Sequence, residues 1–328
     1  MSTRHLVDPA LRAALDFFPQ ARLTAETLAT ARESMRLMMQ SGASATPASA
    51  APDVEVRQRL VRAPEGHEVG LLVYRPRGPA QLRPAVLHIH GGGYVLGSMS
   101  MMDGANRQLA AELDCVVTSV DYRLAPETPH PGPIEDCYTA LRWVHANAQN
   151  LGIDATRLAI SGESAGGGLA AALALLARDR GEVPVIFQRL IYPMLDDRSC
   201  TESDPNPFTG EFVWTRADNR FGWRSLLGHE PGVPGVSPYA AAARAADLAG
   251  LAPAFISVGS LDLFFDENLD YARRLVRAGV PTELHVYPGA FHGSDVATGA
   301  ALTIDAQRSA REALRRAFTC GPAGAADT

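Results

Sequence analysis

The stretch Leu158-Ala159-Ile160-Ser161-Gly162-Glu163-Ser164-Ala165-Gly166 decides the fold of this chain. An apolar run typical of a buried strand leads directly into Gly-x-Ser-x-Gly, and a helical run rich in alanine and leucine follows over residues 165–178. The glycines predict a sharp turn, because a side chain at Gly162 or Gly166 would collide with neighbouring backbone. Such a turn holds Ser164 at the carboxyl edge of a sheet, beside a helix N-terminus that favours developing negative charge. The pattern indicates a nucleophilic serine.

Strand-like and helical runs alternate on both sides of this turn, from about residue 54 onward. This alternation predicts right-handed crossovers and a mostly parallel, eight-stranded sheet flanked by helices. Only Ala63–Glu68 separates the first two strand runs, so we expect an antiparallel start. The expected strands are Val54–Val61, Val69–Tyr74, Ala85–His90, Cys115–Val120, Leu158–Ile160, Val185–Tyr192, Ala254–Val258 and Glu283–Tyr287, and the expected helices are Asp103–Leu113, Ile134–Asn147, Ala165–Arg178, Asp266–Ala278 and Ala300–Phe318.

Two segments lie outside this alternation. Residues 1 to about 40 have the apolar spacing of helices, and the segment 41–52 has the composition of a linker. Residues 196–250 form a long insertion between two strands, and such insertions are usually functional, often as a lid. We therefore expect a helical cap and three parts: N-terminal cap helices and linker (1–50), an α/β catalytic domain (51–195 and 251–328), and a cap insertion (196–250).

A cluster of methionines, Met35, Met38 and Met39, ends the N-terminal helical segment. Methionine adapts to irregular surroundings, so these side chains either pack in the ordinary way or form a mobile wall over an apolar ligand.

The run His90-Gly91-Gly92-Gly93 follows the third expected strand. Glycines in such a loop let backbone N–H groups turn toward a substrate oxygen, as the oxyanion loop of lipases and esterases does. We expect Gly92, Gly93 and Ala165 to be the oxyanion donors. The alternative is a merely flexible turn.

A serine nucleophile needs a histidine base, and the base needs a carboxylate to orient it. In α/β hydrolases the acid and then the histidine follow the serine in the chain. His292 lies in a loop after the last expected strand, whereas His285 lies within that strand. Asp262 comes soonest after the strand Ala254–Val258, whereas Asp266 suits the first turn of the next helix. We expect Asp262 and His292 to complete the triad, with Asp266 as the alternative acid.

The composition excludes several chemistries. All 30 residues counted as lysine or arginine are arginine, which excludes P-loop, pyridoxal-phosphate and Ser-x-x-Lys mechanisms because each needs a lysine. The net charge of −6 argues against a nucleic-acid partner. His88 and His90 form a His-x-His pair, but no further ligand set accompanies them, so we expect no metal and no cofactor.

The location and oxidation state follow from simple features of the sequence. No apolar segment follows Met1–His5, and the run Gly166–Ala177 is too short for a membrane span. We expect a cytoplasmic protein without stable membrane insertion. Cys115 and Cys137 are expected to be buried free thiols, because no disulfide framework is apparent.

These motifs together resemble the bacterial hormone-sensitive-lipase-type esterases. The resemblance covers roughly residues 55 to 318 and rests on five features: His90–Gly97, Asp121–Glu127, Gly162–Gly166, and the loops carrying Asp262 and His292. It implies hydrolysis of short- to medium-chain carboxylic esters, no cofactor, and a cap built from N-terminal helices and an insertion before the acid. It also implies dimers through the last strand, Glu283–Tyr287, and a structural network behind the site that includes Glu127. The chain departs at Glu163, where many members have aspartate.

The substrate pocket is less determined by sequence than the triad. We expect Tyr94, Phe208, Phe212 and Trp214 to line a pocket for a small-molecule ester. An amide or formamide substrate of the same triad is one alternative. The other is a receptor without activity, because the plant gibberellin receptors resemble this family but lack the catalytic histidine, whereas His292 is present here.

Overall fold

The computed structural model describes residues 2–18, 22–40, 51–79, 81–201, 203 and 205–320. Within these residues lie eight strands, each overlapping an expected one: β1 (Val54–Arg62), β2 (Glu68–Pro76), β3 (Arg83–Ile89), β4 (Val116–Asp121), β5 (Ile153–Glu163), β6 (Phe187–Ile191), β7 (Ala254–Gly259) and β8 (Thr282–Tyr287). They form one sheet in the order β1-β2-β4-β3-β5-β6-β7-β8. The predicted antiparallel start is confirmed and extends further than expected, since β2 pairs antiparallel with both β1 and β4. All other pairings are parallel.

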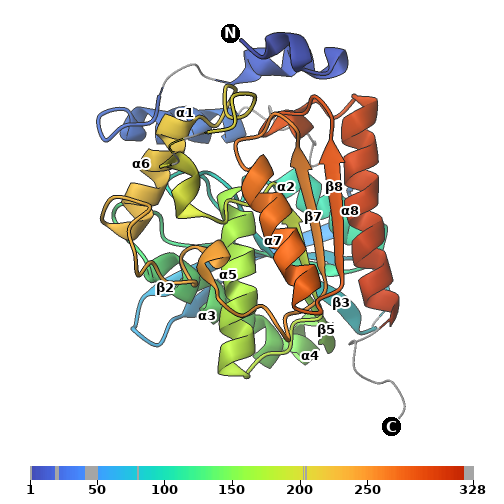
Figure 1. The fold of residues 1–328 in the computed structure, drawn as a ribbon. Coiled ribbons are helices and arrows are strands. Elements are labelled where there is room, and N and C mark those ends of the chain that lie inside the picture. The colour runs from blue at the N-terminus through green and yellow to red at the C-terminus, as the bar shows by residue number, and fades with distance from the viewer. Residues whose placement is uncertain are drawn as a thin grey trace.

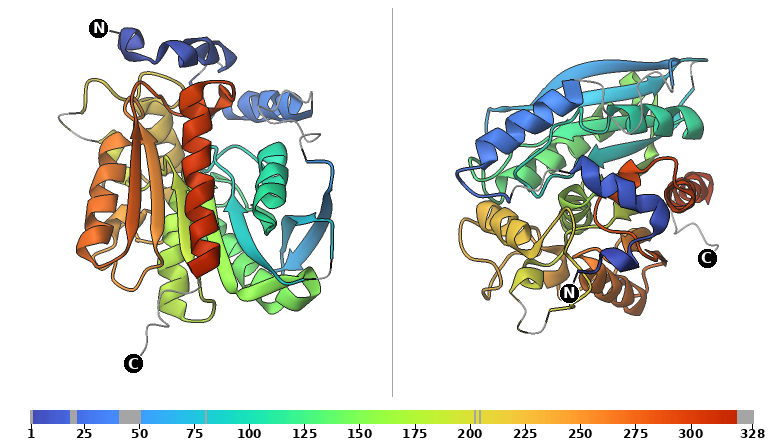
Figure 2. Two further views of the ribbon diagram at one scale, coloured as in Figure 1. Left: turned by 90° about the vertical axis from the view of Figure 1, so that its right-hand side faces the viewer. Right: turned by 90° about the horizontal axis from the view of Figure 1, so that it is seen from above.

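Helices cover both faces of this sheet (Figures 1 and 2). One face carries α3 (Gly132–Ala146), α5 (Ala165–Arg180) and α7 (Phe265–Arg277), and the other carries α2 (Asp103–Leu113) and α8 (Ala301–Cys320). A short α4 (Ala148–Leu151) precedes β5. No helix among the described residues is both long enough and apolar enough to span a membrane.

The hydrophobic core explains why β3 and α5 are apolar throughout. Every residue of β3 is buried, because this strand lies inside the sheet with helices on both faces. In α5, residues 165–177 are all buried, since the helix lies between the sheet and its neighbours rather than at the surface. The site is therefore built on two rigid, fully packed elements.

The N-terminal segments differ in detail from the expected helices. Residues Pro9–Phe17 form a 3₁₀ helix, η2, and the α-helix α1 spans Leu28–Gln40. They lie above the carboxyl ends of the strands together with α6 (Arg216–Leu227) of the insertion (Figures 1 and 2). The expected linker falls mostly on residues 41–50, which lie outside the described residues.

Side-chain contacts join these N-terminal segments to the rest of the molecule. The backbone N–H of Leu23 donates to Asp218 in the first turn of α6 (2.8 Å). Arg32 of α1 pairs with Glu127 (2.7 Å) and also donates to the carbonyl oxygen of Ala125 (2.9 Å). The family resemblance implied that Glu127 belongs to a network behind the site; its side chain is instead 63% exposed and holds α1 in place.

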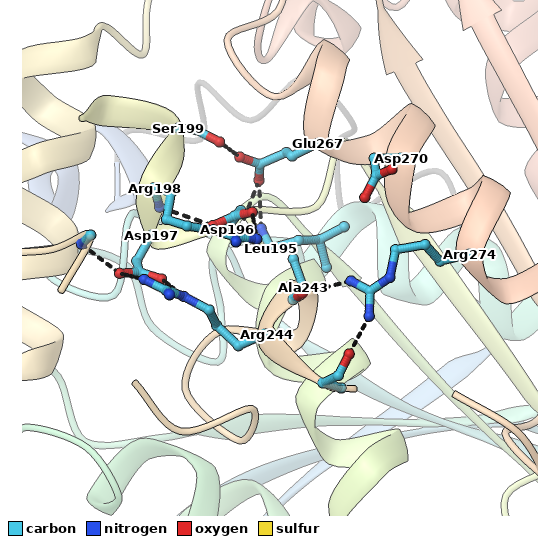
Figure 3. Close-up of polar contacts among 12 residues, drawn as sticks. Leu195, Asp196, Asp197, Arg198, Ser199, Ala243, Arg244, Glu267, Asp270 and Arg274 are labelled. Atoms are coloured by element: carbon cyan, nitrogen blue, oxygen red, sulfur yellow. Dashed lines mark hydrogen bonds and ion pairs between the residues drawn. The ribbon is translucent and has the colours of Figure 1, made fainter. Parts of the chain in front are cut away.

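The insertion 196–250 is fastened at both of its ends (Figure 3). Near its start, Asp197 forms an ion pair with Arg244 near its end (2.7 Å), and the Asp197 side chain is fully buried. From α7, Glu267 accepts a hydrogen bond from the N–H of Leu195 (2.6 Å), and Arg274 donates to the carbonyl of Ala243 (2.6 Å). The two ends of the insertion therefore meet beside α7, although Asp197 and Arg244 are 47 positions apart in the chain.

Candidate active site

The turn between β5 and α5 has the predicted form. Ser164 has φ 57° and ψ −125°, a conformation that a residue with a side chain rarely adopts. A Cβ atom on Gly162 would lie 2.2 Å from the carbonyl oxygen of Gly166, and one on Gly166 would lie 2.1 Å from that of Ile89. The prediction that side chains at these two glycines would collide with backbone is confirmed. The strained turn places Ser164 at the carboxyl end of the sheet, at the N-terminus of α5, where it is 7% exposed.

Ser164, His292 and Asp262 form one hydrogen-bonded chain. The Ser164 Oγ lies 2.9 Å from His292 Nε2, and His292 Nδ1 lies 2.9 Å from Asp262 Oδ2. Asp262 is fully buried, and its other oxygen accepts the backbone N–H of Phe264 (2.9 Å). A carboxylate held in this way fixes the imidazole so that Nδ1 carries the proton and Nε2 can accept one from the serine.

The two alternative residues lie elsewhere. Asp266 is in the first turn of α7, as expected, and accepts a hydrogen bond from Asn206 (3.2 Å). His285 lies on β8, where its Nε2 is 2.7 Å from Glu283 and its ring packs against Phe255. Neither side chain joins the chain of hydrogen bonds at Ser164.

The glycine loop after β3 lies directly against this serine. A Cβ atom on Gly91 would be 3.3 Å from that of Ser164, and Gly92 and Gly93 both have positive φ (115° and 61°). Among the described residues, none accepts a hydrogen bond from the N–H groups of Gly92, Gly93 or Ala165. Three backbone donors without protein acceptors therefore adjoin the nucleophile, which is the arrangement that an oxyanion hole needs.

His90 shapes this loop from within the core. Its ring stacks on Tyr122 at 4.3 Å, and its Nδ1 lies 2.8 Å from the carbonyl oxygen of Gly91. Burial lowers the pKa of His90 to about 4, so the ring is neutral and donates from Nδ1. Because the C=O and N–H of one peptide point in opposite directions, this bond orients the N–H of Gly92 away from His90.

Glu163, beside the nucleophile, belongs to a buried polar cluster. Its carboxylate lies 2.7 Å from His88 Nε2 and accepts a hydrogen bond from Arg189 (3.1 Å). Burial raises the pKa of Glu163, but His88 and Arg189 outweigh this and lower it to about 2. The Nδ1 of His88 faces Asn106 (3.2 Å). His88 and His90 thus have separate partners, and no cluster of three or more possible metal ligands occurs among the described residues.

Trp214 is the expected pocket residue that lies nearest the reactive groups. A Cβ atom on Gly93 would be 2.0 Å from the Trp214 ring, and the ring centroid lies 6.4 Å from that of His292. The indole N–H donates to Asn219 (3.1 Å), which holds the ring in place. Trp214 therefore joins the insertion to the glycine loop.

The other three expected pocket residues are dispersed. Tyr94 is fully buried, and its hydroxyl donates to the carbonyl of Met194 (3.1 Å). Phe212 packs edge-on against Phe291, the neighbour of His292 in the chain (6.0 Å). Phe208 is 55% exposed. The role of the four aromatic residues in a substrate pocket stays a prediction.

Sequence reasoning did not find two rings that enclose His292. Phe264 meets its ring edge-on at 5.1 Å, and Tyr192 does so at 4.8 Å. Tyr192 has φ +36°, unusual for a residue with a side chain. Phe264 follows Asp262 closely, and Tyr192 directly follows β6. Both residues come soon after the carboxyl end of a strand, and this position is the sequence feature that could have identified them.

Comparison with known proteins places the chain in a family. Residues 86–295 match a family described as alpha/beta hydrolase fold. The chain belongs to this family. It is 37% identical over 298 residues to carboxylesterase NlhH of Mycobacterium tuberculosis, and the alignment covers 88% of each chain. The expected fold class and the resemblance to hormone-sensitive-lipase-type esterases are thereby confirmed.

Solved structures agree with this assignment. A bacterial heroin esterase has a TM-score of 0.90 at 40% identity, covering 97% of this chain and 99% of its own. Esterase LipW from Mycobacterium marinum has a TM-score of 0.83 at 39% identity, covering 96% and 97%.

Proposed function

We propose that this chain is a serine carboxylesterase in which Ser164, His292 and Asp262 are the catalytic triad. The observation that carries the proposal is the chain of 2.9 Å contacts from Ser164 through His292 to Asp262, directly beside three unused backbone N–H groups. The carboxylesterase and esterase relatives at 37–40% identity support ester rather than amide chemistry.

The acylation step follows from this geometry. Ser164 Oγ attacks the ester carbonyl carbon while its proton passes to His292 Nε2. The carbonyl oxygen becomes an oxyanion, which accepts hydrogen bonds from the N–H groups of Gly92, Gly93 and Ala165. The imidazolium, stabilised by Asp262, then gives its proton to the leaving alkoxy oxygen, and the alcohol departs from an acyl-enzyme.

Deacylation uses the same groups. Water attacks the acyl carbon and gives a proton to His292, the oxyanion forms again in the same hole, and collapse returns the proton to Ser164 Oγ as the carboxylic acid leaves. Neither half of the cycle calls for a group beyond the side chains and backbone named here.

We further propose that the described parts of residues 1–50 and of the insertion 196–250 form the cap over this site. The hydrogen bond from Leu23 to Asp218 joins the two segments, and a second contact joins Thr3 Oγ1 to Glu211 (2.6 Å). Because the ring of Trp214 adjoins both Gly93 and His292, we expect the cap to limit the acyl chain to short or medium length.

Two further proposals concern assembly and location. β8 is an edge strand whose Leu284 and Val286 are 38% and 40% exposed, so it offers free backbone and apolar side chains to a second copy. Light scattering in solution tests for this homodimer.

We place the protein in the cytoplasm, because Cys115 and Cys137 are buried as free thiols, which fits a reducing compartment.

The function is tested by release of p-nitrophenol from its acetate, butyrate and octanoate esters. Wild type should hydrolyse the short esters, and Ser164→Ala should lose about 10³-fold or more in kcat. Ser34→Ala, an exposed serine on α1, is the matched control and should keep full activity. Matched acetyl ester and anilide substrates separate esterase from amidase activity. Equal activity of wild type and Ser164→Ala would exclude Ser164 as the nucleophile, and an inactive wild type would favour a receptor.

A further inference from the structure

Tyr192 joins two parts of the site that are about 100 residues apart in the chain. It follows β6, and its backbone N–H donates to the carbonyl of Ser257 on β7 (2.6 Å). Its ring meets His292 edge-on at 4.8 Å, and its hydroxyl donates to Asp295 Oδ1 (2.9 Å). The backbone of Tyr192 has φ +36°, which residues with a side chain avoid unless their surroundings enforce it.

Asp295 is on the same loop as His292, three residues further along. It lines a partly open cavity of about 110 Å³ behind the site, together with Tyr192 and Glu163. Glu163 has two partners, the imidazole of His88 and the guanidinium of Arg189. By contrast, no arginine or histidine among the described residues forms an ion pair with Asp295, and Tyr192 is the side chain that holds it. A half-buried carboxyl with so little compensation next to the loop of His292 needs an explanation.

We propose that Tyr192 and Asp295 are positioning residues for the base: the Tyr192 hydroxyl fixes the loop that carries His292, and the Asp295 carboxylate provides a second negative charge that favours its imidazolium. The proposal rests on the function proposed above. Asp262 orients the imidazole through Nδ1, whereas Tyr192 and Asp295 act through ring packing and charge.

The electrostatic surroundings agree with this role. Burial raises the pKa of Asp295 and nearby Glu163 raises it further, while the Tyr192 hydrogen bond and the charge of His292 lower it. When His292 takes the proton of Ser164, the positive charge of its imidazolium favours the ionised form of Asp295. The charged or titratable groups that face this region are His88 on β3, Glu163 on β5, Arg189 on β6, Asp262 before α7, Tyr287 on β8 and Arg311 on α8.

The experiment compares wild type with Tyr192→Phe, Asp295→Asn and the double variant, using p-nitrophenyl butyrate. Tyr192→Phe keeps the ring and removes only the hydroxyl. Each single variant should lose about 10-fold or more in kcat, with KM within about twofold, because the base is misplaced while the pocket is intact. The double variant should be no worse than the poorer single variant, because both changes break one interaction.

The pH profile and a matched control distinguish this role from simple stabilisation. Removing a negative charge near His292 disfavours the imidazolium, so the acidic limb of kcat/KM should move to lower pH by at least about 0.5 unit in Asp295→Asn. The same shift should appear in the NMR titration of the His292 imidazole, which requires no turnover. Tyr239→Phe removes a surface hydroxyl that donates to Asp179 (2.7 Å) and should change neither readout.

The possible results separate the proposed esterase function from the positioning role of Tyr192 and Asp295. An inactive wild type contradicts the esterase assignment, not the role of Tyr192. An active wild type whose variants melt at lower temperature but keep kcat, or keep the acidic limb and the His292 titration unmoved, overturns the positioning role.

Discussion

Replacing Glu163 by glutamine should destabilise the protein in a pH-dependent way. Glu163 has a side chain only 10% exposed, between His88 at 2.7 Å and Arg189 at 3.1 Å. Its pKa falls from 4.5 to about 2 on folding, because the two partners outweigh the cost of burial. At 1.36 kcal/mol per pKa unit, ionised Glu163 contributes about 3 kcal/mol, the same order as the loss on breaking a buried ion pair.

The sign of the pH dependence follows from the lowered pKa. A carboxyl with a depressed folded-state pKa contributes its full stability above its unfolded value and loses it as pH falls through the folded value. The difference in unfolding free energy between wild type and Glu163→Gln should therefore be constant above about pH 5 and shrink between about pH 4.5 and pH 2.

Urea unfolding at pH 8, 7, 5, 4 and 3 measures this difference. Glu33→Gln is the matched control, because Glu33 forms the same kind of pair with Arg36 at the surface (2.6 Å) and should lose little at any pH. The reasoning is refuted if Glu163→Gln loses no more than Glu33→Gln at pH 7. It is also refuted if its loss is the same at pH 3 as at pH 8.

Two further substitutions test the loop and the insertion. Gly93→Ala places a Cβ atom 2.0 Å from the Trp214 ring at a residue with φ +61°, so kcat/KM for p-nitrophenyl butyrate should fall about 100-fold. The control is Gly181→Ala, at φ +66°, where no atom lies within 4 Å of the new Cβ; this variant should keep full activity. Asp197→Asn leaves Arg244 without its buried partner and should cost about 3 kcal/mol, seen as a lower urea midpoint and faster hydrogen exchange across residues 196–250. Full activity of Gly93→Ala, or unchanged exchange in Asp197→Asn, would show that these contacts do not matter.

The resemblance to known esterases could be found from the sequence because its motifs are local. Gly162 is required by the backbone of Gly166, four residues further along, and α2 begins and ends at the expected residues, Asp103 and Leu113. Asp262 and His292 were distinguishable from Asp266 and His285 because strands and loops differ in their local apolar pattern.

The side chains that surround these groups could not be predicted from local sequence patterns. The partners of Glu163 come from β3 and β6, and the contact between Tyr192 and Asp295 joins residues 103 positions apart. The expected pocket of four aromatic residues stays a prediction: the Tyr94 hydroxyl is bonded to Met194, whereas Phe208 is 55% exposed.

The sequence by itself determined the strand–helix alternation and the strand–turn–helix pattern around Ser164, since both depend on local periodicity and on turn residues. It also determined the order of nucleophile, acid and base, which follows the α/β-hydrolase pattern. Only the tertiary structure decided the strand order, the antiparallel pairing of β2 with β4, the closure of the insertion by Asp197 and Arg244, and the buried groups behind His292. The physical reason is that a buried charge or a ring contact depends on which segments pack together, and packing joins residues whose separation along the chain leaves no local trace.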